Sequence, residues 1–500
     1  MTDVVDGPTK KRRQVSRPTF VWIVVLSLLT IPHAGLAQTG EVTEEYPRSV
    51  EGRIKEGFAL SPEFEGFVSE LKDGFGYVVK VLPFGTTQLP TRDSTQNPNN
   101  DFLKIPRYTG NLHLRPDFYL RYRGLRFMAK PRLEAQWRQW DEGDFAGETD
   151  TEVDTFVNEW LVSANLPGGF FVSYGRENLQ WGPSYLLSPS NPFFRDNGRA
   201  NPYREVPGSD FARVVWVPSS GWSFSFIANV DEGRQEFISE DFSLPPVVAD
   251  FIEDRLDITP REFEPTYALK VDYTTYRKYL SVIASYREHD RGHLGAFGGW
   301  TVSDGLLLYG EGSVSQGTDA LYPVEVLTTP MGSALAFSPI EDDEESLEAL
   351  MLVGASYTFE LGPTITAEYV VNTAGYNDKE ADRYLELRRR ASQAFLLPDP
   401  IQSISEFRLA QALDPGLRLL RKNYLLLQYA HTQIWNVLSF ILRYTVNLDD
   451  HGSQIRPMVQ VDVGDHTQFF MVGAMNLGPK DTEFRSLVDY GWMIGFEFTF

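Results

Sequence analysis

Two neighbouring segments of the chain carry basic side chains at alternate positions. In 111–123 and 126–138, every second residue counted from the first position of the segment is almost always polar. The only acids among these residues are Asp117 and Glu134. Because side chains alternate between the two faces of a β-strand, these basic groups would share one face. A dense row of guanidinium groups attracts anions and binds them with paired hydrogen bonds. The residues predicted to contact such a solute are His113, Arg115, Arg121, Arg123, Arg126, Lys130, Arg132 and Arg138.

The same basic face has a second interpretation, in which its arginines pair with acids on facing segments and stiffen the wall. Other segments place Arg213, Lys270, Arg287, Arg443 and Arg456 on the same predicted face as Glu159, Asp272, Glu311, Glu368 and Glu497. Anion attraction and ion pairing are compatible, and the sequence leaves both open.

A second candidate site is the segment 183–210, which is rich in proline, aromatic and basic residues. Proline restricts the backbone, and aromatic rings stack on sugars or cations. The segment could fold inward as a constriction that grips anionic groups or sugar rings; the alternative is a packed cap over the outside. The predicted constriction residues are Trp181, Tyr185, Arg195, Arg199 and Arg204.

Catalytic and metal chemistry find little support in the sequence. Histidines are scattered, and no Gly-x-Ser-x-Gly motif accompanies them, so we predict neither an enzyme nor a cofactor. His289 and His293 have ligand-like spacing but no third ligand nearby, and no metal site is predicted. The run Glu341–Glu345 is interpreted as a solvated loop, with weak calcium binding as the alternative. A net charge of −22 argues against nucleic acid as a partner.

The elements that would position these residues are β-strands with one apolar and one polar face. Such strands are too charged on one face for a protein core and too apolar on the other for water. Apolar side chains facing lipid and polar ones facing a lumen resolve both conflicts. Eighteen segments fit: 75–83, 111–123, 126–138, 154–165, 170–181, 211–218, 222–230, 266–275, 279–287, 294–302, 306–315, 349–359, 364–374, 422–431, 435–447, 455–463, 467–477 and 490–500.

The connections between these segments alternate between short turns and long loops. Turns occur at Gly124 and at 303–305, for example, whereas 183–210, 231–263, 316–348 and 375–421 are long. This alternation is typical of all-β, antiparallel up-and-down barrels of 16–18 strands in membranes, with short periplasmic turns and long extracellular loops.

The long segment 375–421 contains a predicted helix. Asn377 and Glu380 have the spacing of a capping box, and a charged helical stretch follows. A helical insert of this length could plug or gate the lumen; the alternative is an extracellular protrusion.

The last strand carries a family resemblance. Tyr490, Trp492, Ile494, Phe496, Phe498 and Phe500 share one parity, and Gly495 precedes the last two by three and five positions. This pattern resembles the C-terminal strand signal of bacterial outer-membrane β-barrels, although Met493 stands where that family prefers a polar residue. The resemblance implies a bacterial outer-membrane location, contact with lipid and lipopolysaccharide, and recognition of Phe500 by the barrel-assembly machinery.

The N-terminus indicates export. Lys10–Arg13 precede an apolar run from Phe20 to Ile31, and Gly35 and Ala37 precede a plausible cleavage site. We predict a signal peptide at 1–37, a periplasmic segment with a short helix at 38–73, and the barrel at 74–500. The chain has no cysteine, so an exported fold must be held together by other means.

A shorter stretch resembles, locally, the Wzi-type capsule-assembly barrels, which help to attach capsular polysaccharide. Its residues are Gly175, Arg176, Trp181, Gly182, Pro183, Leu186, Leu187, Ser188 and Asn191. Two functions are therefore expected. The first is a porin-like channel for small anionic or sugar-like solutes with a basic wall. The alternative is a non-conducting barrel that binds surface polysaccharide or aids capsule or envelope assembly.

Overall fold

The computed structural model describes residues 70–194, 198–234, 263–287, 291–318, 320–329, 332–338 and 346–500 of the chain. The predicted signal peptide, Arg195, His289 and the acidic run at 341–345 lie outside these residues, as does the periplasmic segment up to residue 69.

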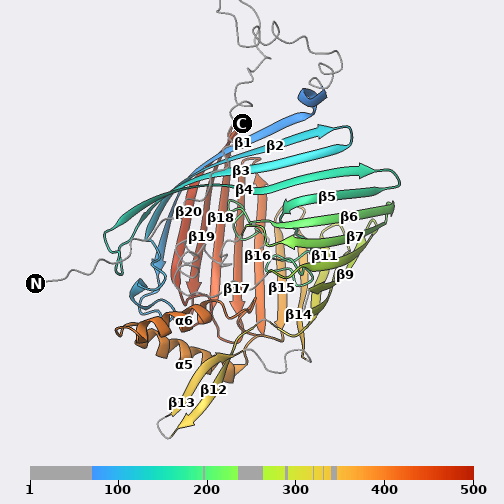
Figure 1. The fold of residues 1–500 in the computed structure, drawn as a ribbon. Coiled ribbons are helices and arrows are strands. Elements are labelled where there is room, and N and C mark those ends of the chain that lie inside the picture. The colour runs from blue at the N-terminus through green and yellow to red at the C-terminus, as the bar shows by residue number, and fades with distance from the viewer. Residues whose placement is uncertain are drawn as a thin grey trace, which may run out of the picture. The chain divides into compact units, whose positions relative to one another are not determined.

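Eighteen strands in the described residues form a single antiparallel sheet that closes on itself. Its first strand, β1, pairs with β2 on one side and with β20 on the other, and Figure 1 shows the resulting barrel. The strands are β1 (Phe75–Pro90), β2 (Tyr108–Tyr122), β3 (Leu125–Gln139), β4 (Thr149–Leu166), β5 (Phe170–Glu177), β6 (Ser209–Ser219), β7 (Trp222–Asp231), β8 (Thr266–Thr274), β9 (Lys278–Arg287), β10 (Arg291–Thr301), β11 (Leu306–Gln316), β14 (Leu347–Thr358), β15 (Thr364–Asn372), β16 (Asn423–Ile434), β17 (Leu438–Asn447), β18 (Ser453–Val463), β19 (Thr467–Leu477) and β20 (Val488–Thr499). The prediction of an 18-stranded up-and-down barrel is confirmed.

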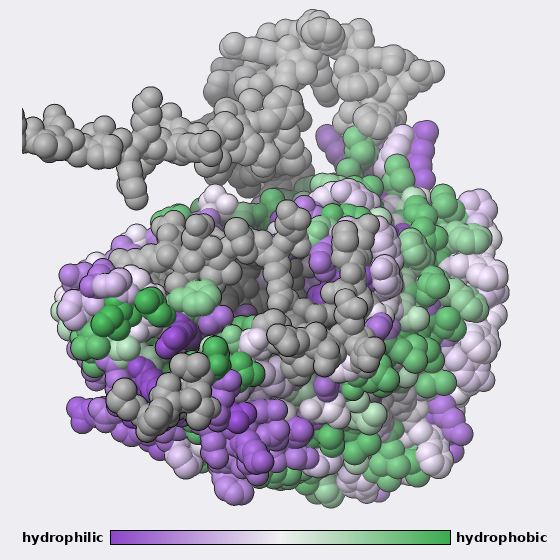
Figure 2. All heavy atoms as spheres, turned by 60° about the horizontal axis from the view of Figure 1, so that its bottom comes forward, coloured by the Kyte–Doolittle hydropathy of each residue, from purple (hydrophilic) through white to green (hydrophobic). Residues whose placement is uncertain are grey.

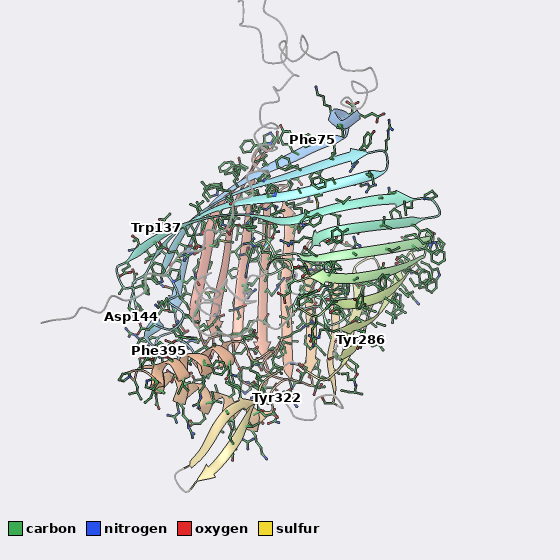
Figure 3. The ribbon with its side chains drawn as sticks, in the orientation of Figure 1. Phe75, Trp137, Asp144, Tyr286, Tyr322 and Phe395 are labelled. Atoms are coloured by element: carbon green, nitrogen blue, oxygen red, sulfur yellow. The ribbon has the colours of Figure 1, made fainter. Side chains whose placement is uncertain are left out.

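The strands present apolar side chains outward, as the alternation predicted. On β9, Leu280 is 51% exposed and Tyr286 is 54% exposed, whereas Ser281 and Ile283 between them are buried. Figure 3 labels Tyr286 on one side of the barrel and Trp137 of β3 on the other, and Figure 2 shows hydrophobic residues over the side wall. A sheet without free edges satisfies its own backbone groups, so it can hold this apolar wall in a bilayer.

The seam between the first and last strands shows why the final segment alternates so strictly. Ile494 and Phe496 of β20 point outward, whereas Gly495 is buried against β1. The backbone of Phe500 exchanges hydrogen bonds with Val79 at 3.1 and 2.9 Å. Closure therefore extends to the last residue of the chain.

Short turns join the strands at one end of the barrel, which we call the turn end. The long connecting segments lie at the opposite end, which we call the loop end. The loop end also holds elements that the alternation did not predict. The segment between β11 and β14 contains a two-stranded hairpin of β12 (Tyr322–Thr329) and β13 (Gly332–Ser338), and a 3-10 turn, η1 (Pro98–Asn100), follows β1. Figure 1 shows the hairpin extending away from the barrel.

The predicted helix in 375–421 is present, together with a second one. In α5 (Asp378–Phe395), Asn377 accepts a hydrogen bond from the Glu380 N–H at 3.0 Å, and Glu380 accepts from the Asn377 N–H at 2.8 Å. The second helix, α6 (Ile401–Leu413), packs against α5.

The two helices lie beyond the strand ends rather than among the strands (Figure 1). Phe395, labelled in Figure 3, meets Phe102 edge to face with ring centroids 6.0 Å apart, and Leu409 is fully buried in the same cluster. Burying each such side chain stabilises the fold by roughly 1.5–3 kcal/mol. Residues at the end of the insert nevertheless reach the segment 178–208, because Arg418 donates to the carbonyl oxygens of Ser188 and Asn191, each at 3.4 Å. Whether the insert plugs the lumen or protrudes stays a prediction.

Candidate functional site

The segment between β5 and β6, residues 178–208, enters the barrel and contacts the inner wall. We call it the lumen loop. Glu368 on β15 accepts hydrogen bonds from the backbone N–H of Tyr185 at 2.8 Å and of Leu186 at 3.2 Å. The hydroxyl groups of Ser184 and Tyr309 donate to the same carboxylate at 3.2 and 2.7 Å. The loop thereby satisfies a carboxylate that is 1% exposed.

A second wall carboxylate is bound in the same way. Glu311 on β11 accepts hydrogen bonds from the Ser188 hydroxyl at 2.5 Å, the Ser190 hydroxyl at 2.7 Å and the Ser190 N–H at 3.1 Å. Gly182 lies directly over this carboxylate, because a Cβ built on it would be 2.3 Å from Glu311 Oε2. Its φ of +89° is in the left-handed region that favours glycine. Residues 182–190 are thus fitted closely to β11 and β15.

The far end of the lumen loop is fixed to a different part of the wall. The Tyr203 ring stacks on Phe470 of β19 with centroids 3.7 Å apart, and its hydroxyl donates to Gln468 at 2.7 Å. Glu205 forms an ion pair with Arg132 of β3, whose Nη2 donates to Oε1 at 2.6 Å, and lies 3.7 Å from Arg115 Nε. The loop therefore crosses the lumen between two attachments.

Glu205 contributes to this second attachment through its negative charge. Burial alone would raise the pKa of Glu205, but the hydrogen bonds from Arg132 and the nearby charge of Arg115 outweigh it and hold the pKa below its usual range. The carboxylate is consequently ionised at neutral pH, when its interaction with both arginines is strongest.

Arginines gather where the lumen loop passes β17. Arg443 is buried and donates to Gln428 Oε1 at 3.1 and 2.9 Å and to the carbonyl oxygen of Arg199 at 3.3 Å. Arg456 on β18 is the register partner of Arg443. The guanidinium groups of Arg199 and Arg443 lie 4.9 and 5.8 Å from the ring of Tyr185. This group, the Arg443 cluster, brings three cations and an aromatic ring together.

The residues predicted on β2 and β3 fall into two groups. Towards the middle and the loop end they have acidic neighbours: Lys130 lies 2.5 Å from Glu159, Arg138 pairs with Glu152, and His113 Nδ1 lies 3.2 Å from Glu134. Arg115 and Arg132 pair with Glu205, as described above. Ion pairing is thus the observed arrangement for the lysine and the arginines of this group, whereas His113 Nδ1 also lies 2.9 Å from Arg115 Nη2. A direct role in selecting solutes stays a prediction.

The remaining three predicted residues lie near the turn end and are exposed. Arg123 pairs with Glu70 at 3.1 Å. Arg121 and Arg126 are register partners on β2 and β3, and no ion pair joins either of them to another residue within the described ranges.

The predicted constriction residues are placed by the lumen loop. Trp181 packs edge to face on Phe193, 6.2 Å between centroids, and Tyr185 and Arg199 belong to the Arg443 cluster. Arg204 is half-buried beside Tyr203. Sequence reasoning counted Tyr203 among the aromatic residues of this segment and Ser188 within the local family resemblance, but it did not identify Glu205, Ser184 or Ser190. Glu205 follows Arg204 directly, but nothing in the sequence says that it faces β3 across the lumen.

The described ranges contain neither a helical membrane span nor a cluster of metal-ligating side chains. None of their helices is long and apolar enough to cross a bilayer. No three histidine, aspartate or glutamate side chains in them come together as metal ligands would.

The closed antiparallel sheet and its apolar outer wall define the class of this protein: it is a membrane-spanning β-barrel of the bacterial outer-membrane type. Among solved structures it is similar to OccK5 (OpdH) of Pseudomonas aeruginosa, with 10% identity over 86% of this chain and 99% of that chain and a TM-score of 0.46. OccAB3 of Acinetobacter baumannii matches at 11% identity over 85% and 99%, also with a TM-score of 0.46.

The outer membrane protein OprD of Pseudomonas aeruginosa matches at 7% identity over 85% of this chain and 94% of that chain, with a TM-score of 0.46. At these identities and scores the likeness concerns the fold and carries no functional conclusion. No protein-family model and no curated protein matches the chain.

Proposed function

We propose that this protein is an outer-membrane channel for small solutes, that the lumen loop forms its constriction, and that the Arg443 cluster favours anionic or sugar-like solutes there. The observation that carries the proposal is the bonding of Arg443. This buried guanidinium is held by the neutral oxygens of Gln428 and Arg199, so these bonds fix its position without cancelling its charge.

The neighbouring acids hold the lumen loop beside this cluster. Glu368 and Glu311 accept hydrogen bonds from hydroxyl and amide groups of the loop, and Glu205 pairs with Arg132 and Arg115. Of these three carboxylates, Glu205 is the one whose charge is matched by a direct ion pair.

The test is ion selectivity in planar bilayers under a salt gradient. A unit charge at about 4 Å changes the energy of an ion by about 1 kcal/mol even in water, or roughly fivefold in local concentration. Wild type is expected to prefer anions, Arg443→Gln to lower the anion-to-cation permeability ratio by up to about fivefold, and Arg443→Lys to retain it.

The matched control is Arg121→Gln, which removes an equal charge at the turn end. If Arg121→Gln lost anion selectivity while Arg443→Gln kept it, the selectivity would be assigned to the basic residues of β2 and β3. A wild-type reversal potential without an anion preference would contradict the preference itself, and a reversal potential unchanged in both variants would contradict its assignment to either arginine.

The second candidate function is a non-conducting barrel that binds surface polysaccharide or aids capsule or envelope assembly. The observation that favours it is the attachment of the lumen loop at both ends, which places protein across the lumen. The same recording separates the two functions: a wild-type protein that inserts as a folded barrel and carries no current would favour this second function.

A further inference from the structure

The outer wall contains a groove formed by β9, β10 and β11. Its volume is about 480 Å³, within the roughly 300–1,000 Å³ typical of small-molecule sites. The lining residues include Leu280, Gly298, Trp300, Leu308 and Gly310, all on the outward parity of their strands. The groove faces lipid, on the opposite side of the sheet from the lumen loop.

Strand register explains the groove. Gly298 and Gly310 are direct partners across β10 and β11 and lack side chains, so they form its floor. The next outward-facing pair, farther from the turn end, is Ala296 and Gly312. Because both residues are small, the low floor continues along the strands. The flanking partners are large: Leu280 lies opposite Gly298, and Val353 lies opposite Gly310. The result is a trough parallel to the strands between two apolar ridges.

The turn end of the trough carries a cation. Lys278 and Leu308 are the register partners of Trp300, so these three form one row across the trough's turn end. The Lys278 ammonium lies 5.2 Å from the Trp300 ring centroid. Its backbone is fixed by the β8–β9 turn, in which the Thr275 hydroxyl and N–H both donate to the Lys278 carbonyl oxygen, at 3.0 and 2.7 Å.

The preceding residue, Arg277, adds a second cation on the same turn, and within the described ranges no carboxylate forms an ion pair with either of them. Trp at the membrane interface places its ring at headgroup depth. A trough for an acyl chain that ends in a Trp ring and the Lys278 ammonium, with Arg277 on the adjoining turn, complements an anionic amphiphile.

We propose that this groove is a binding site for one anionic glycerophospholipid of the leaflet at the turn end. Its phosphate contacts Lys278 and Arg277, and one acyl chain lies along Gly298 and Gly310. Free phosphate would gain nothing from the apolar trough, and a zwitterionic lipid would gain less from the cations. This site is independent of the proposed channel function.

The experiment is native mass spectrometry of the detergent-purified full chain, incubated with phosphatidylglycerol or with phosphatidylcholine. Wild type is expected to retain one phosphatidylglycerol at a collision energy that removes phosphatidylcholine. Each cation near an anionic headgroup strengthens binding roughly fivefold. Lys278→Gln should therefore lower phosphatidylglycerol retention by about that factor, and Lys278→Arg should restore it.

A second variant tests the trough without touching its charge. Gly310→Leu fills the floor, and it is sterically mild because a Cβ at Gly310 meets only the Leu352 carbonyl oxygen, at 3.5 Å. Gly292→Leu is the matched control: it adds the same side chain on the outward parity of β10, where the nearest atom to a Cβ is 3.8 Å away. Gly310→Leu should abolish retention of phosphatidylglycerol, and Gly292→Leu should leave it unchanged.

Three results would overturn the proposal. The first is equal lipid retention by wild type and Gly310→Leu, and the second is no preference for phosphatidylglycerol over phosphatidylcholine. The third is a dimer mass in wild type that disappears in Gly310→Leu, because the occupant of the groove would then be a second copy of the chain. A variant that loses lipid but conducts as wild type does would leave the channel proposal intact.

Discussion

At the scale of single residues, Gly182 shows how closely the lumen loop fits the wall. Gly182→Ala would place a methyl group about where Glu311 Oε2 now lies, at a backbone conformation that already disfavours alanine. We expect the variant to displace the loop from β11 and to raise single-channel conductance relative to wild type. Planar bilayer recording measures this directly.

The matched control for that variant is Gly147→Ala. Gly147 has a similar φ of +84°, but a Cβ there meets nothing within 4 Å. It therefore shares the backbone strain of Gly182→Ala without its collision. Equal conductance changes in the two variants would mean that strain, rather than the contact with Glu311, governs the loop.

At the scale of elements, all eighteen barrel strands could be predicted because one physical constraint fixes each of them. A strand between lipid and a lumen must alternate along its whole length, and that pattern is local. The β12–β13 hairpin projects beyond the barrel, so Tyr322 and its neighbours are not held to an apolar and a polar face. The second helix, α6, was not predicted, because prolines dominate its surroundings.

The candidate site was harder to predict for the same reason. Arg132 was identified because its strand alternates, but its partner Glu205 is 73 positions away in a loop without periodicity. Likewise the three serines gain meaning only from Glu311 and Glu368, which approach them through the closure of the barrel. Sequence reasoning thus located the wall and missed the bonds across it.

The loop end has an acid, Glu483 in the connection between β19 and β20, that should make this end sensitive to pH. Burial raises the pKa of Glu483 to about 7, although hydrogen bonds from the Tyr424 hydroxyl and the Leu420 N–H favour its ionised form. Between the ordinary pKa of 4.5 and 7, folded Glu483 holds a proton that an unfolded chain releases. Local stability is therefore greatest below about pH 4.5 and falls as the pH rises to 7, by on the order of 2 kcal/mol.

Hydrogen exchange of the backbone amides of 417–424, corrected for intrinsic rates, measures this loss. Glu483→Gln is expected to remove the pH dependence, because glutamine stays neutral. Glu386→Gln is the control on the exposed face of α5, where Glu386 pairs with Arg389 and Arg390. Protection that rises between pH 4.5 and 7 would contradict the assignment.

At the scale of the whole molecule, closure depends on close packing at the seam. A Cβ at Gly495 of β20 would lie 2.4 Å from the Cβ of Phe84 on β1. Gly495→Val should therefore weaken the seam by at least about 1–3 kcal/mol and lower the temperature at which the folded band disappears from unheated gels. Gly76→Val on β1, where a Cβ meets nothing within 4 Å, should leave that temperature unchanged.

The unlike chemistry of the two loop attachments has one more consequence. Glu205 is bound through its charge, so this bond is complete above its ordinary pKa and is lost as the pH falls through its lowered value. A carboxyl group that accepts from serine hydroxyls and amides still accepts after protonation, so residues 184–190 stay in place. Acid would then release Glu205 from Arg132 and Arg115, whereas Tyr203, stacked on Phe470 and hydrogen-bonded to Gln468, would still hold the far end of the loop on β19.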